Sequence, residues 1–224
     1  MYGIPTPKGK NIKVTDSANY RGIALCSIYG KIFDLIILSR YAGKFCKSEL
    51  QFGFKHKRST NICTMVLNET LSYYANNGRS VYCTFLDATK TFDRVDYAKL
   101  FKLLVHRMHP PVRVRLLLNM YTSHVYRVSW NGICSVPFTV RNGVKQGGVI
   151  SPAHFCIYFD KLLGKLAEAG VGCYIGNICI GALAYADDIV FFFTIHFVIL
   201  FLISIVCTLL LMHYVCEIND NNNM

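Results

Sequence analysis

The chain has 224 residues, enough for one ordinary domain or two small ones. Lys and Arg number 24 against 13 Asp and Glu, which gives a formal net charge of +11 and excludes an acidic, disordered chain. Hydrophobic residues make up 53% of the sequence, so the chain can bury a sizeable core. All Lys and Arg lie at or before Lys165, so the body of the protein carries the positive charge. Such a body favours a polyanionic partner, either nucleic acid or anionic lipid.

The ten cysteines form no C-x-x-C pair and have no histidine at zinc-finger spacing, so they predict neither a structural zinc site nor a disulfide framework. We expect reduced thiols, mostly in the core, as in an intracellular protein. Met1–Tyr20 is rich in Lys, Pro and Asn and lacks the basic-then-apolar pattern of a signal peptide. The predicted location is therefore intracellular, in the nucleus or the cytoplasm.

The amino-terminal third of the chain predicts two helices after a polar start. Residues 1–22 are polar, with prolines and glycines interspersed, and are predicted as a loop. An apolar helix is predicted over about residues 24–41. Ser59 or Thr60 can cap a second helix, which reaches about Tyr74.

A buried strand and two further helices are predicted next. Val81–Leu86 is short and rich in β-branched and aromatic residues, so it is predicted as a strand that runs into Asp87. Asp96 can cap a helix that ends at about His106, and another helix is predicted over Arg113–Tyr121.

The next segment predicts a hairpin and a long helix. Val125–Trp130 and Val136–Arg141 flank the dipeptide Asn131–Gly132, which is typical of a type I′ turn. A glycine-rich loop then precedes Pro152, which is favourable in the first turn of a helix over about Ala153–Glu168.

Apolar strands dominate the region that follows this helix. Val171–Ile175 and Ile178–Ala184 are predicted to pair, and the second leads into Tyr185–Asp188 and then Ile189–Phe193. Two adjacent carboxylates are therefore expected at the tip of an apolar hairpin.

Three aspartates thus lie at the ends of apolar strands, namely Asp87, Asp187 and Asp188. A half-buried carboxylate is costly unless it is paired or bound to a cation. Carboxylate oxygens suit Mg²⁺ or Mn²⁺, and two such ions can support phosphoryl or nucleotidyl transfer. Each aspartate alone could equally be an ordinary turn or strand-end residue.

Five blocks in order resemble the conserved motifs of reverse transcriptases. Phe85–Asp93, Asn142–Pro152 and Tyr185–Asp188 resemble motifs A, B and C of that family. Upstream, Asn19–Ile23 and Gln51–Phe54 resemble the fingers motifs of its non-LTR retrotransposon, or LINE-type, branch.

The resemblance implies an α+β fold of the right-hand polymerase type. Residues 1–80 would be the fingers, and residues 81–193 the palm, an antiparallel sheet flanked by helices. The family continues into motif D and a thumb, and neither is evident after residue 193, so the expectation is a chain without a thumb. The implied activity is that of an RNA-directed DNA polymerase, which adds dNTPs to the 3′-hydroxyl of a DNA primer on an RNA template with two Mg²⁺ or Mn²⁺ ions.

The resemblance also assigns roles to residues. Asp87 and Asp187 match metal-ligand positions, Asp188 matches the second aspartate of motif C, and Phe92 matches the ring that rejects the ribonucleotide 2′-hydroxyl. Arg21 matches a fingers arginine that grips the incoming triphosphate, a task that suits the guanidinium fork. Further dNTP contacts are expected at Gln146, Gly147, Tyr185 and Ala186, and nucleic-acid contacts at Lys55, Lys57 and Arg58.

Residues 194–216 carry no formal charge and are rich in Ile, Leu, Phe and Val. They are long enough for a transmembrane helix, which would leave residues 217–224 as a polar tail. Their composition also fits translation of a thymine-rich reading frame or intron, because thymine-rich codons specify Phe, Leu, Ile and Val. These features leave an alternative, a catalytically inactive, truncated relic that binds nucleic acid or associates with membrane.

Overall fold

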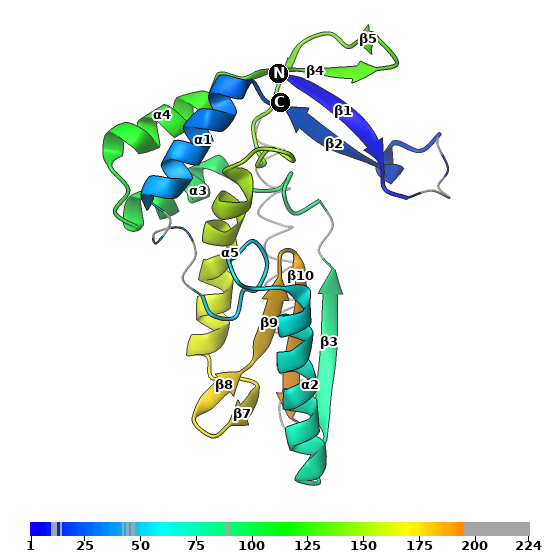
Figure 1. Ribbon diagram of the computed structural model, residues 1–224, viewed down its shortest axis with the longest axis vertical. Coiled ribbons are helices and arrows are strands. Elements are labelled where there is room, and N and C mark those ends of the chain that lie inside the picture. The colour runs from blue at the N-terminus through cyan, green and yellow to red at the C-terminus, as the bar shows by residue number, and fades with distance from the viewer. Residues whose placement is uncertain are drawn as a thin grey trace, which may run out of the picture.

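The computed structural model describes residues 1–9, 13, 15–41, 43, 45, 48–87 and 90–194. Its elements are, in chain order, β1 (Tyr2–Pro7), η1 (Ser17–Asn19), β2 (Tyr20–Leu25), α1 (Ile28–Tyr41), α2 (Thr60–Asn76), β3 (Val81–Asp87), α3 (Tyr97–His106), α4 (Pro111–Thr122), β4 (Val125–Trp130), β5 (Ile133–Cys134), β6 (Phe138–Thr139), α5 (Ser151–Glu168), β7 (Cys173–Ile175), β8 (Ile178–Ile180), β9 (Ala182–Tyr185) and β10 (Asp188–Thr194). Figure 1 shows a broad upper part with α1, α3, α4, β1, β2 and β4, and a narrower lower part around β3, β9 and β10.

The lower part is a three-stranded antiparallel sheet between two helices. The strand order is β3-β10-β9. Along β10, Val190 and Phe192 pack with residues of α2, while Ile189 and Phe191 pack with residues of α5. Because successive side chains of a strand point to opposite faces, burial on both faces explains the uninterrupted apolar sequence of β10.

The upper part is a helical core joined to a second sheet. Helices α1, α3 and α4 pack around the first half of α5, with Leu100, Leu104, Leu117 and Phe155 among the buried side chains. The second sheet has the order β2-β1-β4-β5, and β6 also pairs with β4. Since α5 runs from the upper part into the lower part, it joins the two cores (Figure 1).

The loop predicted for residues 1–22 is wrong for residues 2–7 and 20–22. Residues 2–7 form β1, which pairs antiparallel with β2 from Tyr2↔Leu25 to Pro7↔Tyr20. The helix predicted over residues 24–41 is also wrong at its start, because Ala24 and Leu25 belong to β2 and α1 begins at Ile28. Pairing between distant segments outweighed the local preference of these residues.

The predicted helix caps are confirmed. The Ser59 side chain accepts a hydrogen bond from the Ile62 backbone N–H at 3.3 Å, so Ser59 caps α2. The Asp96 carboxylate accepts one from the Lys99 N–H at 2.7 Å, so Asp96 caps α3. Pro152 lies in the first turn of α5, as predicted, although the helix begins at Ser151.

The predicted hairpin after β4 is confirmed at its turn and wrong in its second strand. Asn131 and Gly132 have φ values of +46° and +81°, which fits a type I′ turn. The returning chain pairs as two short strands, β5 and β6, instead of one strand over residues 136–141. Pro137 lies between these strands and has no N–H to donate to a ladder.

The second predicted hairpin is confirmed in part. Strands β7 and β8 pair around the turn at Gly176, but the predicted strand through Ala184 divides at Gly181. A Cβ on Gly172 would lie 2.2 Å from the Gly181 Cα, so the backbones touch at this point. Strand β9 leaves the small hairpin there and pairs with β10.

The described residues contain no helix that is both long and apolar enough to cross a membrane. The predicted membrane segment over residues 194–216 lies outside the described residues except for Thr194, and the predicted polar tail over residues 217–224 lies outside them entirely.

Candidate active site

Strand pairing brings two of the predicted aspartates together at one edge of the lower sheet. Asp87 is the last residue of β3, Asp188 is the first residue of β10, and the two are direct partners in the antiparallel ladder. Asp188 is also the partner of Tyr185 across the β9–β10 turn. The register therefore aligns Asp87, Asp188 and Tyr185 in one row across the sheet.

Asp187 lies in the two-residue turn between β9 and β10. Its Oδ2 accepts a hydrogen bond from the Thr91 hydroxyl at 3.1 Å. Ala186, the other residue of the turn, has φ of +58°, a conformation that non-glycine residues rarely adopt. The loop after β3 and the β9–β10 turn are thus linked through an aspartate side chain.

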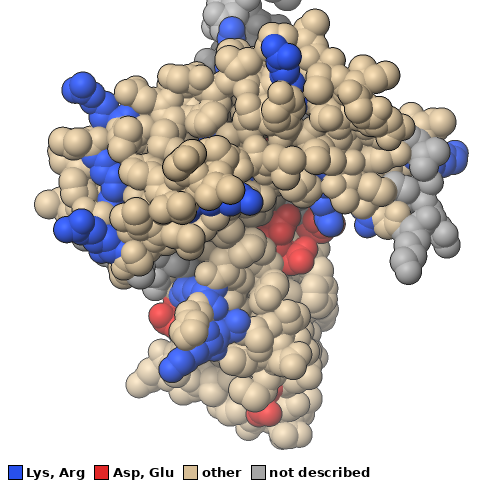
Figure 2. All heavy atoms as spheres, turned by 45° about the horizontal axis from the view of Figure 1, so that its top comes forward, with Lys and Arg blue, Asp and Glu red and all other residues tan. Residues whose placement is uncertain are grey.

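The three carboxylates interact electrostatically. Partial burial raises the pKa of Asp188, and the negative charges of Asp187 and Asp87 raise this pKa further. Among the described residues, no Lys or Arg forms an ion pair with any of the three. Figure 2 shows acidic side chains gathered in a recess of the surface, with basic side chains nearby. Negative charge therefore accumulates at this edge of the sheet.

These carboxylates offer the oxygen ligands that Mg²⁺ and Mn²⁺ prefer. Within the described part of the chain, no three Asp, Glu, His or Cys side chains already converge on one point as a metal cage. The carboxylate donors and the repulsion among them fit a divalent cation.

Phe92 lies close to this edge in an aromatic stack. Its ring stacks on Phe155 of α5, with centroids 4.7 Å apart and an interplanar angle of 9°. Phe54 meets the Phe92 ring edge-on at 6.0 Å. Contacts with these two rings hold the Phe92 ring in one orientation.

Gln146 and Gly147 lie in the loop over residues 143–148, which contacts β2. The Gln146 carbonyl accepts the Ala24 N–H at 2.6 Å, and its side-chain amide donates to Asp93 Oδ1 at 3.2 Å. Gly147 has φ of +94°, and a Cβ there would lie 3.0 Å from the Ala24 carbonyl oxygen.

Arg21 is exposed on β2, and no ion pair connects it to the three aspartates in the described part of the chain.

The three predicted nucleic-acid contacts differ in their surroundings. The Lys55 ammonium donates to the Ser48 carbonyl and lies 3.9 Å from Glu49. Arg58 forms an ion pair with the same glutamate at 2.5 Å. Lys57 is exposed to solvent. Two of the three cations therefore help to hold their own loop.

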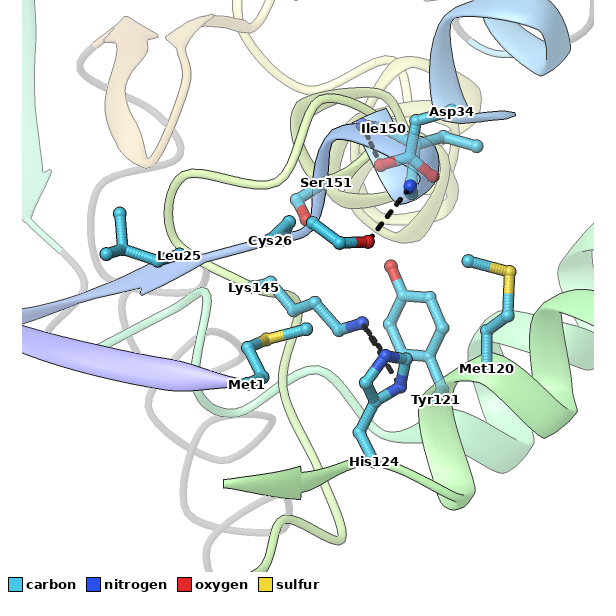
Figure 3. A pocket seen from close by; sticks show the side chains of 12 residues that line it. Met1, Leu25, Cys26, Asp34, Met120, Tyr121, His124, Lys145, Ile150 and Ser151 are labelled. Atoms are coloured by element: carbon cyan, nitrogen blue, oxygen red, sulfur yellow. Dashed lines mark hydrogen bonds between the residues drawn. The ribbon is translucent and has the colours of Figure 1, made fainter. Parts of the chain in front are cut away.

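A pocket of about 150 Å³ lies behind the 143–148 loop (Figure 3). Asp34 accepts the Ile150 N–H at 3.4 Å, and burial raises the pKa of Asp34. The Lys145 ammonium lies 3.3 Å from the ring nitrogens of His124, and burial lowers the pKa of Lys145. This pocket connects α1 to the loop and to the start of α5.

A second pocket, of about 350 Å³, lies between α2 and the sheet. Asp87, Tyr185 and Asp188 are among its lining residues, together with apolar side chains such as Leu67 and Phe85. The aspartate edge therefore borders an apolar recess on the α2 side.

The sequence predicts no role for Gln51, Gly53 or Thr91, although all three contact or hold the turn that carries Asp187. All three lie within segments that resemble the family's motifs, namely Gln51–Phe54 and Phe85–Asp93, and these motifs are the available signal. The contact itself joins residues far apart in the chain, and local patterns do not reveal such contacts.

Residues 6–209 match the family described as reverse transcriptase (RNA-dependent DNA polymerase). The chain belongs to this family. The predicted resemblance is thus confirmed, and the family match continues past Thr194 into the apolar stretch.

Similar proteins in the family come from retrotransposable elements. The chain is 27% identical over 183 residues to the retrovirus-related Pol polyprotein from type-2 retrotransposable element R2DM of Drosophila melanogaster, covering 82% of this chain and 17% of the relative. It is 29% identical over 155 residues to the RNA-directed DNA polymerase from mobile element jockey of the same organism, covering 66% of this chain and 16% of the relative. The chain thus spans less than a fifth of the length of these relatives.

A solved structure supports the same fold. The structure of apo telomerase from Candida tropicalis, truncated from its C-terminal domain, matches with a TM-score of 0.53 and 14% identity, over 86% of this chain and 43% of that chain. At this level of identity the likeness concerns the fold alone. The family match and the structural match therefore both indicate a reverse transcriptase fold with mixed helices and sheets.

Proposed function

We propose that the chain is the fingers and palm portion of an RNA-directed DNA polymerase, which adds dNTPs to a DNA primer on an RNA template. The observation that carries this proposal is the meeting of Asp87, Asp187 and Asp188 at one sheet edge in a chain of the reverse transcriptase family. In this proposal residues 1–80 form the fingers and residues 81–193 form the palm, and the protein acts inside the cell.

In this proposal Asp87 and Asp187 hold two Mg²⁺ or Mn²⁺ ions, with Asp188 beside them. Such ions, when bound, activate the attacking hydroxyl and stabilise the leaving phosphate oxygens. The raised pKa of Asp188 agrees with this assignment, because burial and, after it, the negative charges of Asp187 and Asp87 disfavour the ionised carboxylate, and a divalent cation would offset both effects.

The remaining residues would bind and select the substrate. The Phe92 ring, fixed against Phe155, would crowd a 2′-hydroxyl and favour dNTPs over rNTPs. Gln146 and Gly147 would lie against the template and the nascent base pair, where Gly147 permits a close approach of the backbone, and Tyr185 and Ala186 border the aspartates. A further set of cations would contact triphosphate or nucleic acid, namely Arg21, Lys55, Lys57 and Arg58.

The test is Mg²⁺-dependent dNTP incorporation on a primed RNA template by the full chain and by Asp187→Asn. We expect incorporation by the wild type and a loss of at least about 100-fold in the variant, because the variant keeps the shape but removes a charged ligand. Asp96→Asn is the matched control, since it makes the same charge change at a helix cap and should leave incorporation unchanged. Equal incorporation by wild type and Asp187→Asn would refute the assignment.

A further inference from the structure

A short segment beside β9 extends the lower sheet. The Leu50 carbonyl accepts the Ala184 N–H at 2.8 Å, and the Phe52 N–H donates to the Ala184 carbonyl at 2.8 Å. Gln51 is the parallel bridge partner of Ala184. The backbone of residues 50–52 is therefore fixed to the strand that leads into the aspartate turn.

The Gln51 side chain binds the turn itself. Only 1% of Gln51 is exposed. Its Oε1 accepts hydrogen bonds from the Ala186 N–H at 2.9 Å and from the Gly53 N–H at 2.8 Å, and its Nε2 donates to the Ala186 carbonyl at 3.1 Å. One amide thus holds both backbone polar groups of Ala186, the residue with positive φ next to Asp187.

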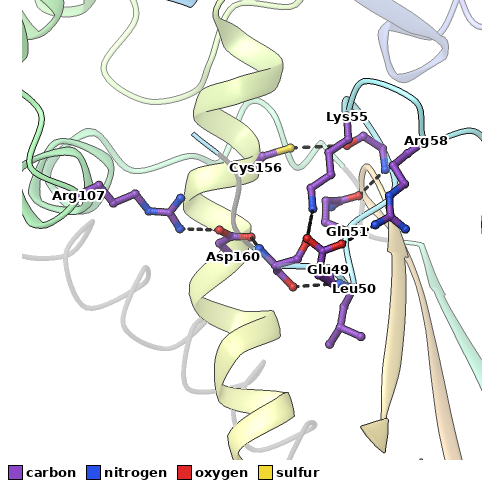
Figure 4. Close-up of polar contacts among 10 residues, drawn as sticks. Glu49, Leu50, Gln51, Lys55, Arg58, Arg107, Cys156 and Asp160 are labelled. Atoms are coloured by element: carbon purple, nitrogen blue, oxygen red, sulfur yellow. Dashed lines mark hydrogen bonds and ion pairs between the residues drawn. The ribbon is translucent and has the colours of Figure 1, made fainter. Parts of the chain in front are cut away.

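The segment that carries Gln51 is anchored to α5 (Figure 4). The Ser48 N–H donates to Asp160 Oδ1 at 3.1 Å, and Arg107 donates to Asp160 Oδ2 at 2.6 Å. Lys55 donates to the Ser48 carbonyl, which closes the segment around Gln51 on itself. The contact of Ser48 with Asp160 therefore ties this segment to α5.

We propose that Gln51 is a positioning residue that fixes the turn carrying Asp187 and Asp188 for cation binding. The inference rests on the proposed function. A primary amide is suited to this task because it supplies a donor and an acceptor at the required spacing. Gly53 permits the approach, since a Cβ there would lie 2.3 Å from the Ala186 nitrogen. Without the amide, the strained turn would lose the contact that holds its conformation.

Two measurements on the full chain test the proposal, with Gln51→Leu as the principal variant. Leucine keeps approximately the same volume and removes all three hydrogen bonds. The first measurement is NMR amide exchange of Ala186, which we expect to become about tenfold faster or more, as for a lost hydrogen bond of about 1.4 kcal/mol. The second is Mn²⁺ binding by calorimetry, which we expect to weaken by about 10- to 100-fold, as for other residues that orient metal ligands.

The matched control is Thr70→Val. Thr70 is fully buried, and its hydroxyl donates to the Val66 carbonyl at 2.7 Å within α2. This variant also removes a buried hydrogen bond, but away from the turn. It should lower thermal stability without changing Mn²⁺ affinity or Ala186 exchange, which separates positioning from a general loss of stability.

Unchanged Mn²⁺ affinity in a folded Gln51→Leu protein would overturn the positioning role. If wild type and Asp187→Asn bind Mn²⁺ equally, the proposed function fails, whereas Ala186 exchange still decides whether Gln51 holds the turn. Should Gln51→Leu not fold, Gln51→Met replaces it, because methionine keeps an unbranched side chain and also removes the amide hydrogen bonds to Ala186 and Gly53. We expect faster Ala186 exchange and weaker Mn²⁺ binding than in the wild type, and wild-type values of both would overturn the role.

Discussion

Replacing Gly53 by alanine should strongly destabilise the protein. The added Cβ would lie 2.3 Å from the Ala186 nitrogen and 2.9 Å from its Cα, and both are backbone atoms. Carbon contacts need about 3.5 Å, so residues 51–53 and the β9–β10 turn must separate by roughly 1 Å. Overpacking of this kind costs about 1–3 kcal/mol, and each buried hydrogen bond that the separation breaks costs about 1 kcal/mol more. We expect a total loss of about 3–4 kcal/mol.

Thermal unfolding of the full chain measures this loss. For a chain of this length, about 3–4 kcal/mol corresponds to a decrease in Tm of roughly 10 °C. Gly164→Ala is the matched control, because this glycine is inside α5 and a Cβ there meets nothing within 4 Å. It should raise Tm by about 2–4 °C, since alanine is favoured over glycine in a helix by about 1 kcal/mol. A Tm for Gly53→Ala within about 2 °C of the wild-type value would refute the close approach described above.

Three further predictions concern stability. Asp96→Ala should lower the free energy of unfolding by about 1 kcal/mol in urea denaturation, whereas Asp96→Asn, which can still cap α3, should change it little. Burial lowers the pKa of His154 to about 3, so the unfolded state binds a proton that the folded state rejects. Stability should therefore fall by about 2 kcal/mol as the pH decreases from 7 to 5, and His154→Gln should lose this part of the pH dependence. Arg107→Met removes the cationic partner of Asp160, whose side chain is only 4% exposed, and should cost about 3–5 kcal/mol. A loss below about 1 kcal/mol in urea denaturation would show that this ion pair contributes little.

Local patterns predicted the elements that local interactions stabilise. Ser59 and Asp96 mark the starts of α2 and α3 because their side chains bind backbone N–H groups three residues on. Asn131–Gly132 marks a turn because both residues tolerate positive φ. The apolar sequence of β10 predicted a strand because both of its faces are buried.

Local patterns failed where distant segments pair. Nothing within residues 1–25 indicates that β1 lies between β2 and β4, because a long stretch of chain separates β1 from β4. Pro5 and Pro7 argue against a strand, because proline has no N–H to donate to a neighbouring strand. However, β1 pairs with β4 only at Tyr2 and Gly3. Pro5 and Pro7 therefore lie beyond the β1–β4 ladder, where no N–H is required for that pairing.

The sequence by itself determined the family and predicted a role for the three aspartates, because the order of the motifs and the carboxylates at strand ends are local properties of the chain. Only the tertiary structure decided that Asp87 pairs with Asp188, that Thr91 binds Asp187, and that Gln51 holds Ala186. These contacts depend on strand register and on the approach of segments that are 96 to 135 residues apart, which long-range packing sets and short sequence patterns do not encode.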